Sequence, residues 1–217
     1  MRDSIKEFAI IVSTTLPIIE PIYEFGSLQV PNQIGFADLR PLFKNKEYIG
    51  CDMREGPGVD KILNLHTIEL PSESVGMALC FDTLEHVENP RKALEEIYRI
   101  LKPDGIVAIS SVMNFPIHDY PNDYWRFTPE AFKSILKPFS NSFVGFRGNK
   151  SFPHTVIGIG FKGTVPILNE FTEKYTIWQR EENKPIRQLV LNLTPPILLP
   201  ILAGVYRGFN VFKKRSN

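Results

Sequence analysis

Apolar runs of strand length recur along the first three quarters of the chain. The run Val75 to Phe81 is nearly continuous in apolar residues, which is typical of a strand buried on both faces of a parallel sheet. Four more runs are apolar and end at turn residues or carboxylates, and two later ones are rich in aromatic and β-branched residues. The pattern predicts seven strands, at 22–27, 47–52, 60–65, 75–81, 106–112, 143–146 and 155–161.

The clearest helical pattern follows the fourth predicted strand. Asn89 is a suitable N-cap, Pro90 fits the first helical position, and apolar residues recur at helical spacing as far as Leu101. Thr128 caps a second helix that runs to about Leu136. Because strands alternate with helices, the crossovers should be right-handed and the sheet doubly wound. Ligands bind outside the carboxyl ends of the strands in such sheets.

Two further segments are predicted to be helical. The apolar run 8–19 is too short to span a bilayer, and no cleavage site of a signal peptide follows it. We therefore expect a first helix that packs on the domain. The polar segment 170–187 is predicted to form a late helix.

Length, charge and cysteine content narrow the class of protein. A chain of 217 residues suits one domain with a full core. The formal net charge of +1 gives no field that would attract nucleic acid. The two cysteines, Cys51 and Cys80, lie within predicted strands, so we expect small buried hydrophobes in a reducing, cytoplasmic compartment.

A glycine and a carboxylate end the first two predicted strands. Gly26 would let the backbone approach a ligand closely, and Asp52 could accept both hydroxyls of a ribose. The same residues could simply make a turn and cap a loop, and the pattern alone does not separate these two interpretations. No G-x-G-x-x-G fingerprint follows the first strand, which disfavours a nicotinamide-dependent oxidoreductase. S-adenosylmethionine has no phosphates, so the absence of a phosphate cradle favours methyl transfer.

Five blocks of the chain resemble the sequence motifs of a known protein family. In order along the chain they resemble the motifs of class I S-adenosylmethionine-dependent methyltransferases, in the subgroup described as a type 11 methyltransferase domain. The resemblance implies an α/β fold, a doubly wound, mostly parallel, seven-stranded Rossmann-like sheet with helices on both faces. The blocks are Tyr23 to Ser27, Gly50 to Asp60, Leu84 to Pro90, Leu101 to Gly105 and Asn114 to Glu130.

The resemblance implies S-adenosylmethionine as the cofactor and assigns residues to it. Glu24 and Gly26 would hold its methionine end, with Ser27 in the same motif. Asp52 would bind the ribose, and Met53 would pack on the adenine. The first motif departs from the family, which prefers more glycines at this place.

Further cofactor contacts are implied at the next two strands. Asn64 and Leu65 would contact the adenine edge, and Phe81 would offer its backbone near the sulfonium. His86 would lie close to the transferred methyl group.

Methyl transfer needs a base only where the nucleophile carries a proton of high pKa. The candidates are His86, His118 and Asp119, of which the last two follow the fifth strand at the ligand-binding edge. Each histidine could equally serve a local structural role. Tyr124 and Arg126 are candidates for substrate contact. No histidine–carboxylate cluster has the spacing of metal ligands, so no metal is expected.

The chain divides into a methyltransferase domain at 1–163 and a helical, apolar extension at 164–217. Residues 188–206 contain no charge and precede a basic end. Residues 188–215 could lie on an anionic membrane surface or pack on the domain or on a second copy in a homodimer. The function that we expect is methyl transfer to a small-molecule acceptor, with a glycan or lipid-linked compound as one option. The alternative is a catalytically inactive binding module that docks through its tail.

Overall fold

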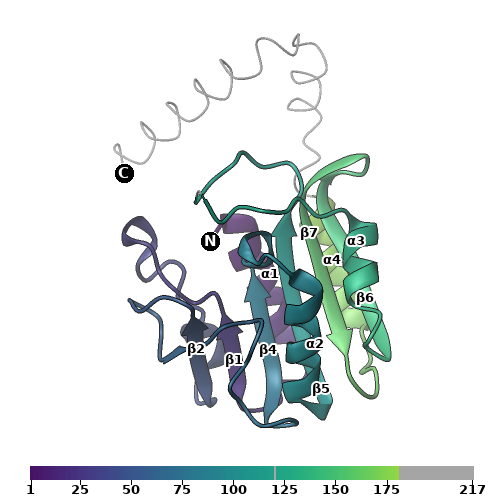
Figure 1. The fold of residues 1–217 in the computed structure, drawn as a ribbon. Coiled ribbons are helices and arrows are strands. Elements are labelled where there is room, and N and C mark those ends of the chain that lie inside the picture. The colour runs from purple at the N-terminus through teal and green to yellow at the C-terminus, as the bar shows by residue number, and fades with distance from the viewer. Residues whose placement is uncertain (120, 181–217) are drawn as a thin grey trace. The chain divides into compact units, whose positions relative to one another are not determined.

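The computed structural model describes residues 1–119 and 121–180. Seven strands form one sheet in the order β3-β2-β1-β4-β5-β7-β6 (Figure 1). The first five strands pair in parallel, while β7 pairs antiparallel with β5 and β6. The mostly parallel, seven-stranded sheet is therefore confirmed. The strands are β1 Ile22–Phe25, β2 Tyr48–Asp52, β3 Lys61–Ile62, β4 Val75–Phe81, β5 Leu101–Val112, β6 Asn141–Asn149 and β7 Phe152–Phe161.

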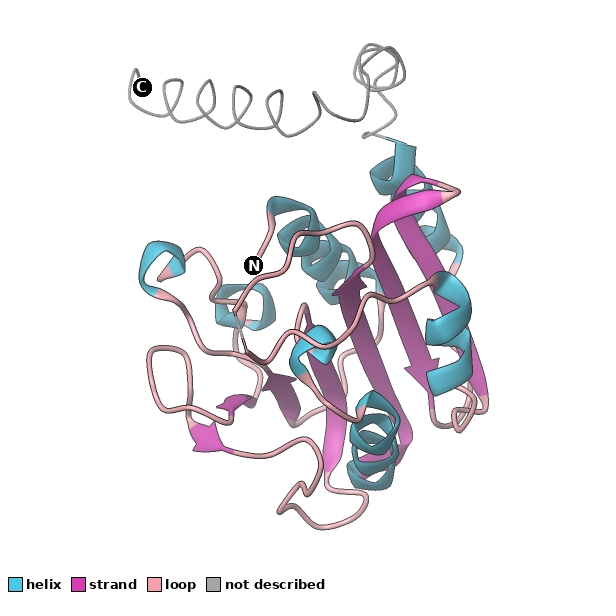
Figure 2. Cartoon of the chain, turned by 45° about the horizontal axis from the view of Figure 1, so that its top comes forward, coloured by secondary structure: helices cyan, strands magenta, loops and turns pink. Residues whose placement is uncertain are grey.

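Helices cover both faces of the sheet, as the doubly wound fold requires. Helices α1 and α4 lie on one face and α2 and α3 on the other (Figures 1 and 2). Because successive side chains of a strand point to opposite faces, Met77 and Leu79 pack with α1, whereas Ala78 and Cys80 pack with α2. The α-helices are α1 Asp3–Thr15, α2 Pro90–Ile100, α3 Pro129–Ile135 and α4 Asn169–Arg180, and the short 3-10 helices are η1 Pro31–Gln33, η2 Arg40–Phe43 and η3 Leu84–His86.

The predicted helix caps are present. The side chain of Asn89 accepts a hydrogen bond from the N–H of Lys92 at 3.1 Å, and Thr128 Oγ1 accepts one from the N–H of Ala131 at 3.1 Å. These bonds satisfy N–H groups that have no partner inside the helix. Both predicted helix starts are thus confirmed, and β4 has the bounds expected from its apolar run.

Several predicted strand boundaries were wrong, including those of β6 and β7, which are longer than the predicted 143–146 and 155–161. The expected first helix is α1, and it ends at Thr15 because Pro17 keeps Leu16 extended at φ −98° and ψ 150°. Strand β3 is only Lys61–Ile62, because the chain turns at Asn64, whose side chain accepts the N–H of His66 at 2.8 Å. Strand β5 begins at Leu101 instead of Ile106, since Leu101 pairs with Val75 across an irregular register.

The compact unit that the structure describes runs from Met1 to Arg180. Helix α4 belongs to it, because Phe171 and Trp178 are buried and the Trp178 indole N–H donates to the carbonyl of Ser4 at 3.0 Å. None of the described helices is long and apolar enough to cross a membrane. The predictions for residues 181–187 and 188–215 lie outside the described residues.

Candidate active site

The parallel strands β1, β2, β4 and β5 bring their carboxyl ends to one edge of the sheet (Figure 1). Several of the predicted residues follow these ends in the chain. Gly26 follows β1 in a left-handed conformation, with φ +88°. A Cβ at this position would lie 2.0 Å from Thr83 Oγ1, in the segment after β4. Only glycine tolerates both the conformation and the close approach. The close approach in this structure is between Gly26 and Thr83, and the approach of Gly26 to a ligand stays a prediction.

The turn after β1 is held by the end of β2. The N–H groups of Gly26 and Ser27 both donate to the carbonyl of Cys51, at 2.8 and 3.0 Å. Ser27 is buried, and its Oγ has no hydrogen-bond partner among the described residues. A ligand hydroxyl or amine at this turn would satisfy that oxygen, in keeping with the cofactor-binding role predicted for Ser27.

Glu24 is a buried carboxyl group in β1, with 4% of the residue exposed. The Tyr48 hydroxyl donates to its Oε2 at 2.6 Å. Burial raises the pKa of Glu24 to about 7, although the bond from Tyr48 opposes this change. Glu24 is therefore half-protonated near neutral pH, and its predicted contact with the methionine end of a cofactor stays a prediction.

Asp52 ends β2 with its side chain mostly buried, 12% exposed. Its Oδ1 accepts the backbone N–H of Arg54 at 3.0 Å, and the Arg54 guanidinium lies 3.7 Å away. The same guanidinium lies 3.7 Å from the carboxylate of Asp119. Met53 stands beside Asp52 with 64% of its surface exposed. Arg54 thus links the predicted ribose carboxylate to the loop that carries Asp119.

The other predicted cofactor residues have their side chains elsewhere. Leu65 is buried in the core beneath α2, and the Phe81 ring packs edge-on against Phe8 at 5.6 Å between centroids. Asn64 uses its side chain for the turn described above. Leu65 and Phe81 can therefore contact a ligand only through the backbone, which is the role that the resemblance implies for Phe81.

Asp82, directly after β4, makes an ion pair at this edge that the sequence did not predict. Both oxygens of its carboxylate accept hydrogen bonds from Arg2, at 2.8 and 3.0 Å, and Ser110 donates to it at 3.0 Å. Arg2 is 80 residues away in the chain. No local pattern links the two, so only the tertiary fold shows this pair.

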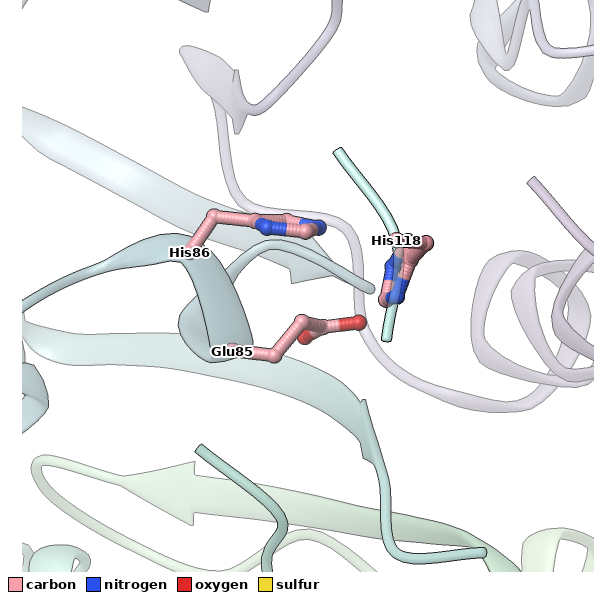
Figure 3. Close-up of side chains that lie close together, drawn as sticks. All are labelled: Glu85, His86 and His118. Carbon is pink, nitrogen blue, oxygen red and sulfur yellow. The ribbon is translucent and has the colours of Figure 1, made fainter. Parts of the chain in front are cut away.

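Glu85, His86 and His118 lie close together beside this edge (Figure 3). One ligand atom of each side chain lies within 4.8 Å of the others. The two imidazole rings meet edge to face, with 4.7 Å between centroids. Glu85 is fully buried, and burial raises its pKa to about 8. Ser111 donates to Glu85 Oε2 at 2.6 Å, while Oε1 has no hydrogen-bond partner among the described residues.

A short ion pair shapes the loop that carries His118. Arg126 donates to both oxygens of Asp123, at 2.6 and 2.7 Å, and holds the pKa of that carboxyl well below its usual range. Asp123 in turn accepts the backbone N–H of His118 at 2.8 Å. Arg126 also donates to the carbonyls of Phe115 and Pro116, each at 3.0 Å. Arg126 therefore holds the loop, and its contact with a substrate stays a prediction.

Tyr124 anchors the same loop to the sheet edge. Its backbone N–H donates to the carbonyl of Glu85 at 2.8 Å, and 47% of the residue is exposed. The contact of Tyr124 with a substrate stays a prediction. In the structure, the rings of His86 and His118 are in contact, and the Arg54 guanidinium lies between the carboxylates of Asp52 and Asp119.

Comparison with known proteins bears on this fold and site. Residues 44–109 match the family model described as a methyltransferase domain. Among curated proteins, no relative matches the chain.

Several solved structures are similar. A 1,6-didemethyltoxoflavin-N1-methyltransferase of Burkholderia thailandensis, with 1,6-didemethyltoxoflavin and S-adenosylhomocysteine bound, is 17% identical; the match covers 75% of this chain and 79% of that one, with a TM-score of 0.55. A possible histamine N-methyltransferase of Thermotoga maritima is 18% identical over 72% of this chain and 89% of that one, with a TM-score of 0.52. At these identities the likeness shows the fold.

The sheet order and the family match define the class of protein. The fold is that of the class I S-adenosylmethionine-dependent methyltransferases, and the predicted cofactor residues Gly26 and Asp52 lie at the carboxyl ends of β1 and β2. The chain carries the methyltransferase domain that its motifs predict, and S-adenosylmethionine is the cofactor of that family.

Proposed function

We propose that this chain transfers a methyl group from S-adenosylmethionine to a small-molecule acceptor whose nucleophilic atom carries a proton. The observation that carries the proposal is the arrangement at one sheet edge. Asp52, suited to a ribose, is joined through Arg54 and Asp119 to the loop that bears His118. His118 in turn contacts His86. This arrangement supports the proposal because the predicted ribose-binding residue and the candidate proton-accepting groups lie at one edge of the sheet.

The chemistry needs little from the protein beyond positioning and a destination for the proton. The acceptor atom attacks the methyl carbon, the carbon–sulfur bond breaks, and the electron pair remains on sulfur as S-adenosylhomocysteine forms. Alignment of the acceptor with the methyl group can supply several kcal/mol. A hydroxyl or N–H acceptor must also lose its proton. His86, His118 and Asp119 stay the proposed residues for that step.

The acceptor surface is supported by the loop that carries His118. Tyr124 and Phe115 are exposed on this loop, and the Phe115 ring lies edge-on to His118 at 4.9 Å between centroids. Exposed aromatic rings beside a polar cluster suit a small molecule with an apolar body and a polar reacting group. A glycan or lipid-linked acceptor is the class to test first, because the uncharged run 188–206 precedes basic residues.

The decisive test is calorimetric titration of the full chain with S-adenosylhomocysteine. Asp52→Ala removes the charge-assisted hydrogen bonds to the ribose hydroxyls, which are worth about 2–3 kcal/mol, so the affinity should fall roughly 30- to 150-fold. Glu69→Ala removes an exposed carboxylate and should leave the affinity unchanged.

Equal affinity of Asp52→Ala and the wild-type chain would remove Asp52 from the cofactor site. If the wild-type chain itself fails to bind S-adenosylhomocysteine, the proposal is wrong. The inactive binding module would then be the better interpretation.

A further inference from the structure

Glu85, His86 and His118 form a cluster with three donor atoms of the kinds that divalent transition metals bind. Glu85 and His86 are neighbours in η3, while His118 arrives from the loop after β5. Figure 3 shows the carboxylate of Glu85 directed toward the His118 ring, with the His86 ring on the same side. Their ligand atoms all lie within 4.8 Å of one another. A small movement of the loop would bring them to the spacing of a metal's ligands.

Both histidines have a second partner that directs a lone pair to the cluster. His86 Nδ1 lies 2.7 Å from the carbonyl oxygen of Asn122. His118 Nδ1 lies 3.2 Å from the carbonyl oxygen of Pro116 and 3.3 Å from Asp123 Oδ2. A carbonyl or carboxylate oxygen accepts hydrogen bonds and has no hydrogen to donate. Each Nδ1 is therefore the donor and carries the hydrogen, which leaves Nε2 of each ring to bind a metal ion. Histidine ligands of metals commonly donate their other N–H to such an oxygen.

Glu85 supplies the independent observation. The residue is fully buried, and its Oε1 has no hydrogen-bond partner among the described residues. Arg2 pairs with the neighbouring Asp82 instead, and the side-chain partner of Glu85 is the neutral Ser111. A buried carboxylate oxygen without a partner costs free energy, which a cation would recover. Among the described residues, Glu85 therefore has no cationic hydrogen-bond partner at the point where the two imidazole rings converge.

We propose that Glu85, His86 and His118 bind a divalent transition-metal ion of the zinc type. Two imidazole nitrogens and one carboxylate oxygen suit zinc better than magnesium or calcium, which prefer oxygen ligands. Three protein ligands leave a coordination position open, as in catalytic zinc sites. The separation of His118 from Glu85 in the chain explains why sequence spacing shows no metal site.

The role of the ion at the acceptor rests on the proposed function. An acceptor hydroxyl that binds the open position has a lower pKa and releases its proton to solvent water. The resulting alkoxide attacks the methyl carbon of the cofactor, and the electron pair of the carbon–sulfur bond stays on sulfur. In the metal-bound chain the ion would thus take over the step proposed above for His86 and His118, which would act as its ligands and no longer as bases.

The test is zinc binding by the full chain, measured without substrate. The protein is stripped with a chelator and titrated with zinc in competition with a chromogenic chelator. We expect one zinc per chain with submicromolar affinity. Glu85→Gln keeps the bond from Ser111 but removes the charge, and His118→Ala removes a ligand; each should weaken binding about 100-fold or more. His154→Ala is the matched histidine control and should bind like the wild-type chain.

Two outcomes would overturn the metal site. One is a stripped wild-type chain that takes up no zinc. The other is zinc binding with equal affinity in the wild-type chain, Glu85→Gln and His118→Ala, because the ion would then lie elsewhere. Circular dichroism of each variant verifies that it is folded. A parallel titration with S-adenosylhomocysteine tests the proposed function separately, since loss of zinc binding leaves cofactor binding at Asp52 intact.

Discussion

The buried carboxyl group of Glu24 makes the stability of the fold depend on pH in an unusual direction. Its pKa in the folded chain is raised to about 7 by burial, from an ordinary value of 4.5. Below about pH 4.5 the group is protonated in both the folded and the unfolded chain. Between pH 4.5 and 7 the unfolded chain releases a proton that the folded chain retains. The free energy of unfolding therefore falls as the pH rises through this range.

The magnitude follows from the two pKa values. Each unit of difference between folded and unfolded chain corresponds to about 1.4 kcal/mol, so the complete loss is roughly 3 kcal/mol above pH 7. Glu24→Gln removes the ionisation and keeps an oxygen that accepts the hydrogen bond from Tyr48. The variant should therefore gain roughly 2–3 kcal/mol relative to the wild-type chain on going from pH 5 to pH 8.

Urea unfolding of both proteins at pH 5 and pH 8 measures this gain. Groups other than Glu24 titrate equally in both proteins and cancel in the comparison. Glu69→Gln, which changes an exposed carboxylate, should show the same pH dependence as the wild-type chain. If the stability difference between Glu24→Gln and the wild-type chain is the same at both pH values, within about 0.5 kcal/mol, burial of Glu24 does not control its ionisation.

Two further substitutions test the close contacts of the site by urea unfolding. Gly26→Ala should cost roughly 2–4 kcal/mol, from its positive φ and from the clash with Thr83 Oγ1. Adding Thr83→Ala should recover part of that cost, and strict additivity would contradict the clash. Arg126→Lys loses the two-pronged contact with buried Asp123 and should cost about 1–3 kcal/mol. The exposed Arg91→Lys should change stability by less than about 0.5 kcal/mol, and equal losses for both lysine variants would refute this role for Arg126.

Much of the fold could be predicted because its signals are local. The apolar run of β4 and the caps at Asn89 and Thr128 depend on residues close together in the chain. The errors arose where distant contacts override the local pattern. Strand β5 extends back to Leu101 because that residue pairs with Val75 of the neighbouring strand, which the turn signal of Lys102 to Gly105 conceals.

The site was less predictable than the fold for the same reason. The resemblance pointed to Asp52 and His86, which lie in short motifs. It gave no role to Glu85 itself, because the importance of Glu85 comes from its burial and from Ser111, 26 residues away. The pair Arg2–Asp82 likewise appears only when the chain is folded, whereas Arg126 and Asp123 lie close together in the chain. A spacing rule cannot find groups that different strands bring together.

The ion pairs Arg54–Asp52 and Arg126–Asp123 differ in strength, and this difference decides which pair a ligand can displace. The Arg54 side chain is 60% exposed and lies 3.7 Å from Asp52, so this pair is worth less than about 1 kcal/mol. Asp123 is only 1% exposed and binds Arg126 through both oxygens. A ligand that binds Asp52 would therefore displace Arg54 at little cost, while Asp123, paired with Arg126, accepts the backbone N–H of His118. The contact between Arg54 and Asp52 is thus weaker than the ion pair that holds the loop carrying His118.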